Sequence, residues 1–156
     1  MKIKYLRIVN YKAISEIDVE CGRMFNVIIG NNGVGKSTIL SAINLLYSWL
    51  LARIRSANAK GRTLSVNCIK EGEKFCSLSI TVEYMGCDFS WTLYKQKSRL
   101  AGSHNLKTDL SDLNSLAELI RDRKDEFLSL PMLVSYGVNR NVSAIHSIYS
   151  TDKLNR

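Results

Sequence analysis

The clearest pattern in the chain is a pair of alternating runs between residues 75 and 95. In each run apolar residues alternate with polar ones, and Met85-Gly86 separates the two runs. Such alternation is typical of strands with one buried and one solvated face, and a short turn containing glycine joins antiparallel strands. The pattern therefore predicts an antiparallel β-hairpin with one face in the core.

Shorter strand patterns occur near the start of the chain and just before the hairpin. Lys2 to Val9 is rich in β-prone apolar residues, and Ile17 to Cys21 alternates apolar and polar residues. Asn10-Tyr11-Lys12 fits a short connection between them. Leu64, Val66 and Cys68 also alternate with polar residues, which makes them a candidate third strand beside the hairpin.

Two further runs are almost continuously apolar, from Met24 to Ile29 and from Met132 to Tyr136. Strands that are buried on both faces of a parallel sheet have this composition, so both runs predict parallel strands. Gly30 ends the first run and Pro131 precedes the second.

Two segments have apolar residues at helical spacing. A helix from about Ser37 to Arg55 is predicted by Ile39, Ile43, Leu46 and Leu50. A second helix is predicted from Ser111, as its N-cap, to about Leu128, with an apolar stripe of Leu113, Leu116, Ile120 and Phe127. Strands and helices in this order predict an α/β fold.

Length and composition are those of a globular protein with one domain. The chain has 156 residues, of which 46% are hydrophobic and 23% charged, and it contains a single proline. These values exclude disordered, collagen-like and repeat proteins. The sequence contains no uninterrupted run of about 18 apolar residues and no apolar leader at its start, so we expect a cytoplasmic protein with no membrane partner.

The chain is basic, with 22 lysines and arginines against 14 acidic residues and a formal net charge of +8. A basic surface attracts polyanions such as nucleic acid, nucleotides or an acidic protein, although it can also serve only for solubility. The basic residues gather in two groups, one formed by Arg53, Arg55, Lys60 and Arg62 and the other by Lys95, Lys97 and Arg99. Each group is either a DNA-facing surface or an ordinary solvated loop.

The four cysteines do not form a recognisable metal or redox motif. Cys21, Cys68, Cys76 and Cys87 contain no C-x-x-C pair, and His104 and His146 do not complete a zinc set. Three of the cysteines fall on the apolar side of alternating runs, which favours buried free thiols. We assign no role to either histidine, and we interpret Trp49 and Trp91 as residues of the core or of the hairpin face.

The candidate chemistry lies in Gly30-Asn31-Asn32-Gly33-Val34-Gly35-Lys36-Ser37, which fits the phosphate-binding P-loop pattern G-x-x-x-x-G-K-[ST]. The glycines let the backbone wrap a phosphate with its N–H groups pointing inward. Lys36 can reach the β- and γ-phosphates, Ser37 can bind Mg²⁺, and Thr38 can lie near the α-phosphate. A predicted strand before the loop and a helix after it supply the expected context, so we predict that the chain binds ATP with Mg²⁺.

The residues around this loop resemble a narrower family. Asn10-Tyr11-Lys12, a strand, and then Gly30 to Thr38 followed by an apolar helix resemble the SMC, RecF and related ABC-type ATPases of DNA repair over residues 1 to about 50. The resemblance implies a P-loop ATPase head with an antiparallel β layer, and a homodimer that forms through the heads when ATP binds. It also places Lys12 near the nucleotide, so that the implied nucleotide-binding residues are Lys12, Gly30, Asn31, Asn32, Gly33, Val34, Gly35, Lys36, Ser37 and Thr38, with Ser37 as the Mg²⁺ ligand.

A second, shorter resemblance lies near the end of the chain. Leu130 to Arg140 resembles the proline, apolar strand and Y-G-x-N-R turn of stand-alone prokaryotic ATPases, among them the PtuA-type ATPases of Septu and retron anti-phage systems. It implies an effector protein, such as a nuclease, or nucleic acid as a partner. Tyr136 and Arg140 could place an arginine beside phosphates, or they could be a packed tyrosine and a surface arginine.

The chain departs from the ABC pattern in its catalytic elements. No run of four apolar residues followed by Asp or Glu is present, so a Walker B strand is missing. Leu100 to His104 suggests a signature loop only faintly, and the charged segment Arg121 to Glu126 that follows is no Walker B strand. We therefore expect residues 1–156 to be the N-terminal lobe of an ATPase head, without the catalytic lobe and with no catalytic residue of its own. The alternatives are a small self-contained P-loop kinase or NTPase, a RecF-type repair ATPase, and a module that binds ATP only structurally.

Overall fold

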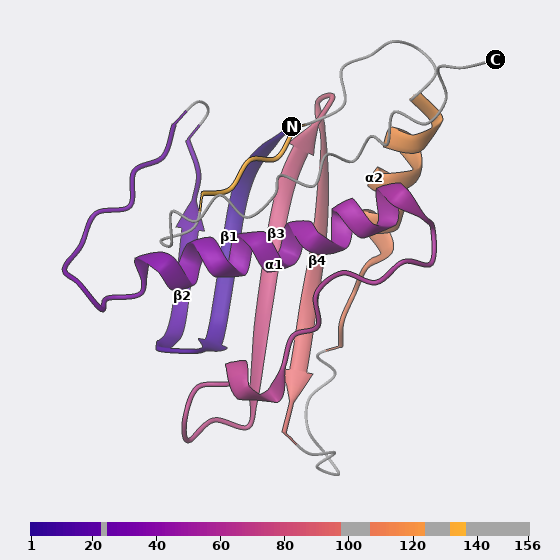
Figure 1. The fold of residues 1–156 in the computed structure, drawn as a ribbon. Helices are drawn as coiled ribbons and strands as arrows, with labels where there is room; N and C mark the ends of the chain where they lie inside the picture. The colour runs from indigo at the N-terminus through magenta and orange to yellow at the C-terminus, as the bar shows by residue number, and fades with distance from the viewer. Residues whose placement is uncertain (23–24, 98–106, 124–131, 137–156) are drawn as a thin grey trace.

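A four-stranded antiparallel sheet forms one layer of the molecule (Figure 1). The computed structural model describes residues 1–22, 25–97, 107–123 and 132–136. The strands are β1 (Lys2–Tyr11), β2 (Ile14–Glu20), β3 (Phe75–Tyr84) and β4 (Cys87–Gln96), and their order across the sheet is β2-β1-β3-β4. β1 therefore pairs with both β2 and β3, although residues 21–74 separate β2 from β3 in the sequence.

The predicted hairpin is confirmed. β3 and β4 pair in register from Phe75 opposite Gln96 to Tyr84 opposite Cys87. Met85 and Gly86 form the turn with φ of +53° and +80°, the left-handed conformation that matches the twist of a two-residue hairpin. Its alternate residues Cys76, Leu78, Ile80, Val82, Trp91 and Leu93 are buried. The opposite face is polar, with hydroxyl pairs between Ser79 and Thr92 and between Thr81 and Ser90.

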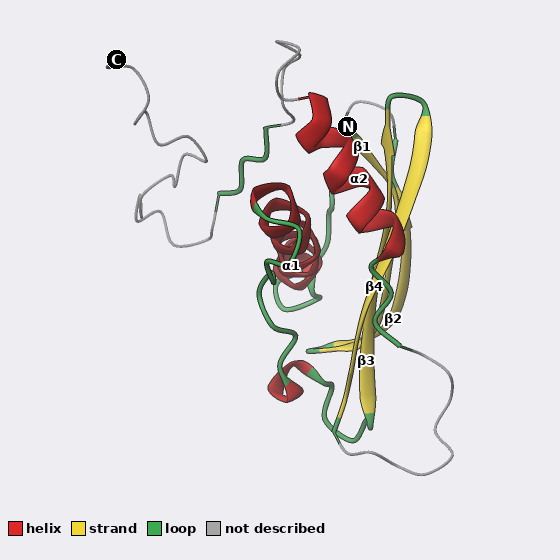
Figure 2. Cartoon of the chain, turned by 90° about the vertical axis from the view of Figure 1, so that its right-hand side faces the viewer, coloured by secondary structure: helices red, strands yellow, loops and turns green. Residues whose placement is uncertain are grey.

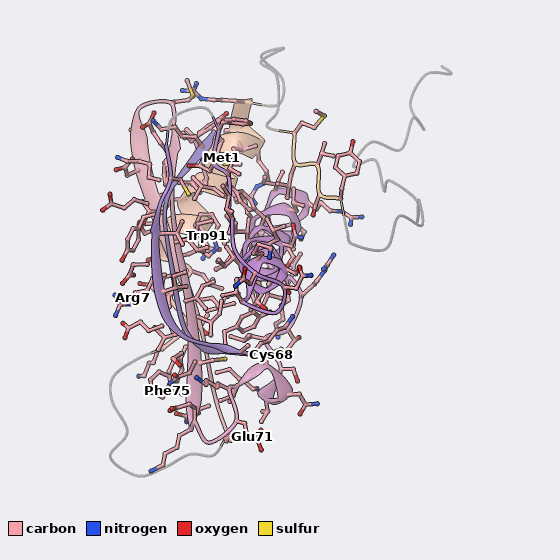
Figure 3. All side chains as sticks on the ribbon, turned by 90° about the vertical axis from the view of Figure 1, so that its left-hand side faces the viewer. Met1, Arg7, Cys68, Glu71, Phe75 and Trp91 are labelled. Carbon is pink, nitrogen blue, oxygen red and sulfur yellow. The ribbon has the colours of Figure 1, made fainter. Side chains whose placement is uncertain are left out.

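Two helices form the second layer and cover one face of the sheet (Figure 2). The longer helix, α1 (Lys36–Arg55), agrees with the prediction to within one residue, and its buried side chains are Ile39, Ala42, Leu45, Leu46, Tyr47 and Leu50. Trp91 of β4 is 1% exposed, and its indole N–H donates to the carbonyl of Leu46 at 3.3 Å. Figure 3 shows this side chain between the sheet and the helix. The interpretation of Trp91 as a core residue is confirmed.

The second helix, α2 (Ser111–Asp122), buries the predicted stripe of Leu113, Leu116 and Ile120. Its N-cap is Leu110, so the prediction of Ser111 as the N-cap was wrong by one residue. Ser111 instead donates from both its N–H and its hydroxyl to Asp109 Oδ1, at 3.0 and 2.7 Å. The predicted continuation to Leu128, with Phe127, lies outside the described residues.

Neither predicted parallel strand forms. Residues 25–29 and 132–136 are irregular, and Ile29 and Met132 are 88% and 86% exposed. Met24 lies outside the described residues. A strand exists only if neighbours accept its backbone hydrogen bonds, and in the described part of the chain all four strands pair with one another in the antiparallel sheet. Both runs are apolar as predicted, but the described residues provide no neighbouring strand that pairs with either run.

The candidate third strand beside the hairpin was also wrong. Its residues form a short 3-10 helix, η1 (Val66–Cys68), with Ser65 as the N-cap accepting a hydrogen bond from the N–H of Asn67. The residue that follows η1, Ile69, makes an isolated bridge to Tyr11. Leu64 is buried, so the alternation reflected one core contact before a turn rather than a strand.

The cysteines are free but not uniformly buried. Cys76 is fully buried, Cys21 and Cys68 are half-buried, and Cys87 in the hairpin is exposed. Burial raises the pKa of the Cys76 thiol to about 12, so this group stays protonated and unreactive at neutral pH. The interpretation as buried thiols is correct for Cys76 alone.

Among the described helices, α1 is long and apolar enough to meet a length and composition criterion for a membrane span. Its mean hydropathy reaches 1.3 over 18 residues. The same helix packs on the sheet and on α2, with six buried side chains on one side. The core helix of a globular protein can meet the same criterion, and 28% of this window is buried.

The loop after α1 passes so close to the helix that glycine is required at residue 61. A Cβ built on Gly61 lies 2.5 Å from the backbone nitrogen of Trp49, which cannot move without displacing α1. We expect Gly61→Ala to lower the free energy of unfolding by about 1–3 kcal/mol. Gly22→Ala is the matched control, because its Cβ meets nothing nearer than 3.5 Å. Thermal or urea unfolding of both variants measures the difference, and equal stabilities would contradict the packing described here.

Candidate functional site: the 30–38 loop and the turn between β1 and β2

The loop of residues 30–38 leads directly into α1 and has the backbone that its glycines allow. Gly33 and Gly35 have φ of +88° and +106°, a region that other residues rarely adopt. A Cβ on Gly30 would lie 2.8 Å from Val34 Cγ1, and one on Gly35 would lie 3.3 Å from Ile14 Cγ1 of β2. All three glycines of the motif are thus explained by conformation or by close approach.

Lys36, the first residue of α1, folds its side chain back over this loop. Its ammonium group donates to the carbonyl oxygens of Gly30 at 2.6 Å and Asn31 at 2.7 Å. The loop therefore holds a full positive charge above its own backbone. Asn31, Asn32, Gly33 and Val34 are exposed around it, so a solvent-borne anion can reach this charge.

The N-terminus of α1 is left without a protein cap. Gly35 is the N-cap, has no side chain to accept a hydrogen bond, and no acidic residue lies in the first turn. The first N–H groups of a helix lack intrahelical partners, and the helix dipole makes this end positive. Ser37 is exposed and Thr38 half-buried in the same turn. This arrangement suits a bound phosphate group, with the Ser37 hydroxyl available to a metal ion.

Lys12 occupies the tight turn between β1 and β2, which the structure brings onto α1. Its backbone has φ of +52°, and its N–H donates to the carbonyl of Cys68 at 2.8 Å. The ammonium group donates to Ser41 Oγ at 3.0 Å and lies 5.3 Å from the centroid of the Tyr11 ring. Ser41 lies one helical turn beyond Ser37, so Lys12 reaches the same helix that the 30–38 loop begins.

Sequence reasoning did not identify Tyr11 and Ser41 as part of this arrangement. The Tyr11 hydroxyl lies 3.2 Å from Ser41 Oγ, and Tyr11 is buried. No local signal marks this pair, because 30 residues separate them and only the packing of α1 on β1 brings them together.

The two carboxylates that follow apolar residues in strand patterns are occupied elsewhere. Glu83 pairs with Lys2 at 3.0 Å, and Asp18 pairs with Arg7 at 3.0 Å. These residues lie on the polar face of the sheet, opposite the helices, where Figure 3 shows Arg7. Neither carboxylate is placed to orient water at the 30–38 loop.

The segment 132–136 contacts α1 and lies beside the first residues of the chain. Asn44 donates to Ser135 Oγ at 2.8 Å, and Met132 and Leu133 line a cavity of about 280 Å³ together with Met1, Lys2, Ile3, Ile43 and Tyr47. Tyr136 is 90% exposed, so the alternative of a packed tyrosine is wrong for this structure. Arg140 and the faint signature at 100–104 lie outside the described residues.

The comparison with known families decides the class of this loop. A family model described as an AAA ATPase domain matches residues 1–149. The chain belongs to this AAA ATPase domain family. It accordingly has the α/β fold of the P-loop NTPases, and the resemblance to ATPases of the RecF type is confirmed.

Individual relatives of this AAA ATPase domain agree with the family. The chain is 24% identical over 144 residues to the Retron Ec83 probable ATPase of Escherichia coli, covering 90% of this chain and 26% of that protein. It is 27% identical over 119 residues to the DNA replication and repair protein RecF of Mannheimia succiniciproducens, covering 76% of this chain and 30% of RecF. A solved structure from work on ATP-driven dimerization and DNA-stimulated activation of SMC ATPases matches 75% of this chain and 79% of its own, with 17% identity and a TM-score of 0.47. The chain thus spans less than a third of the length of these curated relatives.

Proposed function

We propose that the chain is the N-terminal, ATP-binding lobe of an SMC/RecF-like ATPase. The observation that carries the proposal is the 30–38 loop, where the Lys36 ammonium group and an uncapped helix N-terminus meet at an exposed site. Lys36 would bind the β- and γ-phosphates of ATP, and the loop N–H groups would wrap them. Ser37 would hold Mg²⁺, and Thr38 would lie near the α-phosphate.

Lys12 would contact the nucleotide from the other side of α1. In the structure its ammonium group is bound to Ser41 and stacked on Tyr11, which limits its freedom and keeps it beside the helix. A lysine held in this way needs only to exchange one neutral hydrogen bond for a charged partner. Charge-assisted hydrogen bonds are the stronger ones, so this exchange favours nucleotide binding.

The complete protein would act as a larger, cytoplasmic ATPase. Its heads would dimerise on ATP, as the sequence resemblance to SMC and RecF ATPases implies, and the protein would control an effector, such as a nuclease, or a nucleic-acid partner in antiviral defence. The relative named as a retron ATPase supports the retron part of that resemblance. The RecF relative supports the alternative of a DNA repair ATPase. The Walker B carboxylate and the signature loop would come from the catalytic lobe and from the opposing head.

The experiment that tests this proposal measures binding and turnover of ATP by the 156-residue chain. We expect ATP·Mg²⁺ to bind in calorimetry and to be hydrolysed negligibly, because phosphoryl transfer depends on positioning and charge stabilisation that a lobe without Walker B lacks. Turnover of about 1 s⁻¹ or faster that disappears in Lys36→Ala would favour the self-contained NTPase. Absence of binding by a chain that melts cooperatively would contradict the nucleotide site itself.

A further inference from the structure

The two edges of the sheet differ in whether the chain itself closes them (Figure 1). β4 forms one edge, and residues 108–112 lie against it. Thr92 and Asp109 exchange two backbone hydrogen bonds of 2.9 Å. The outward N–H groups of Ser90 and Tyr94 donate at 3.0 Å to side-chain oxygens of the same segment. Three successive outward N–H groups of β4 therefore have partners, and this edge is closed to another strand.

β2 forms the other edge, and its outward backbone groups are open. The N–H of Cys21 donates to the carbonyl of Lys4 at 2.9 Å, and the same register continues to Ile17 opposite Ile8. In an antiparallel pair, the residues between such hydrogen-bonded positions point their N–H and carbonyl groups away from the partner strand. On β2 these residues are Glu16, Asp18 and Glu20. Among the described residues, none is hydrogen-bonded to these outward backbone groups.

The side chains along β2 define what kind of strand fits this edge. Glu16, Asp18 and Glu20 are exposed on the polar face of the sheet. Ile17 and Val19 alternate with them, are half-buried and pack against the core. An added antiparallel strand places its side chains directly opposite those of β2. Such a strand fits when it carries basic residues opposite the three carboxylates and apolar residues opposite the isoleucine and the valine.

This edge is negative although the chain as a whole is basic. Arg7 pairs with both Glu16 and Asp18, so that one guanidinium group serves two carboxylates. Glu20 takes part in none of the ion pairs among the described residues. Three carboxylates against one arginine leave a net charge of −2 along the edge. A basic partner strand is therefore attracted to it.

The other cations near β2 are bound elsewhere. Lys4 pairs with Asp88 of β4 at 2.6 Å. Lys70 donates to Ser15 Oγ, and the Ser15 side chain points to the face of β2 opposite the carboxylates, since successive side chains alternate between faces. Lys12 is held on α1 by its hydrogen bond to Ser41. None of these lysines neutralises the carboxylates of the edge.

We propose that the β2 edge binds an extended segment of a partner protein in which basic and apolar residues alternate. The segment adds a strand antiparallel to β2, and its main chain pairs with the outward groups of Glu16, Asp18 and Glu20. Main-chain pairing supplies affinity, and the alternating side chains supply specificity. A second copy of β2 does not fit, because like charges directly opposite one another are destabilising. This surface is separate from the 30–38 loop, and its binding does not require ATP.

The backbone pairing is tested with the full-length protein, without nucleotide, by fluorescence anisotropy with a short labelled peptide in which lysine alternates with valine. In the antiparallel pair, the lysines opposite the carboxylates point their own N–H groups at β2, whereas the valine N–H groups point away. Methylation of the lysine backbone nitrogens is therefore expected to abolish binding. Methylation of the valine backbone nitrogens is expected to leave it intact.

The side-chain selectivity is tested with two double variants that change the net charge equally. Glu16→Lys with Glu20→Lys is expected to weaken binding of the lysine–valine peptide by about tenfold or more, because two opposite-charge pairs become like-charge pairs. The same variant is expected to gain affinity for a glutamate–valine peptide. Glu118→Lys with Asp122→Lys is the control, because both residues are exposed on α2, on the other side of the sheet from β2 (Figure 1), and it is expected to bind as the wild type does.

Four results would overturn the proposal. The wild-type protein does not bind the peptide if the carboxylates serve only to keep the edge unpaired. Equal affinities of the two methylated peptides would exclude main-chain pairing. Wild-type affinity in the Glu16/Glu20 variant, or an equal loss in the control, would exclude selection by these carboxylates. Circular dichroism melting establishes that both variants are folded, and ATP binding measured in parallel separates this surface from the nucleotide site.

Discussion

Lys36→Ala is expected to weaken ATP binding by about tenfold or more. The substitution removes the ammonium group that the carbonyls of Gly30 and Asn31 hold over the loop, and a hydrogen bond to a charged group contributes about 1.5–3 kcal/mol. At 1.4 kcal/mol for each factor of ten, this predicts a loss of roughly one to two orders of magnitude. Isothermal titration calorimetry with ATP·Mg²⁺ measures it directly.

The matched control for this prediction is Lys60→Ala. Lys60 is exposed in the loop after α1 and contributes the same charge to the whole molecule without touching the 30–38 loop. We expect it to bind ATP as the wild type does. If Lys36→Ala and the wild type had equal affinity, the 30–38 loop would not be the nucleotide site, whatever the family assignment implies for other members.

Local patterns sufficed where an element makes its own hydrogen bonds or pairs with its nearest neighbour in sequence. The helix α1 satisfies its backbone internally, and β3 and β4 need only a two-residue turn to meet. For such elements the spacing of apolar residues is nearly sufficient to predict the secondary structure. The P-loop motif could also be identified from the sequence, because its glycines, Lys36 and the start of the helix are contiguous.

Prediction failed where an element depends on residues far away in sequence. The pairing of β1 with β3 and the contact of Lys12 and Tyr11 with Ser41 arise from the topology, and no periodicity encodes them. The run 25–29 has the composition of a buried parallel strand, but strand formation also requires partners, which composition does not report. Leu64, Val66 and Cys68 show the opposite error, in which three alternating residues were too few to distinguish a strand from a turn.

The second large expected effect is self-association of the isolated chain through the exposed apolar residues of segments 25–29 and 132–136. Phe25, Val27, Ile29, Met132 and Tyr136 are each at least 66% exposed, and they belong to the two runs whose composition is that of buried strands. Exposed apolar patches and unpaired extended backbone promote association. We therefore expect the isolated 156-residue chain to sediment as concentration-dependent oligomers or aggregates at micromolar concentration, or to be stable only with a partner that covers this surface.

The double variant Val27→Asp with Ile29→Asp tests whether this surface is responsible. It places two charges in the exposed run and is expected to shift the chain towards the monomer in sedimentation velocity. Met85→Asp is the control, because Met85 is 58% exposed at the hairpin turn and belongs to neither run. A wild-type chain that sediments as a monomer and melts cooperatively without a partner would contradict the prediction. The self-contained P-loop NTPase would then replace the N-terminal lobe as the better description, since a lobe that needs no partner already buries the apolar surface that its stability requires.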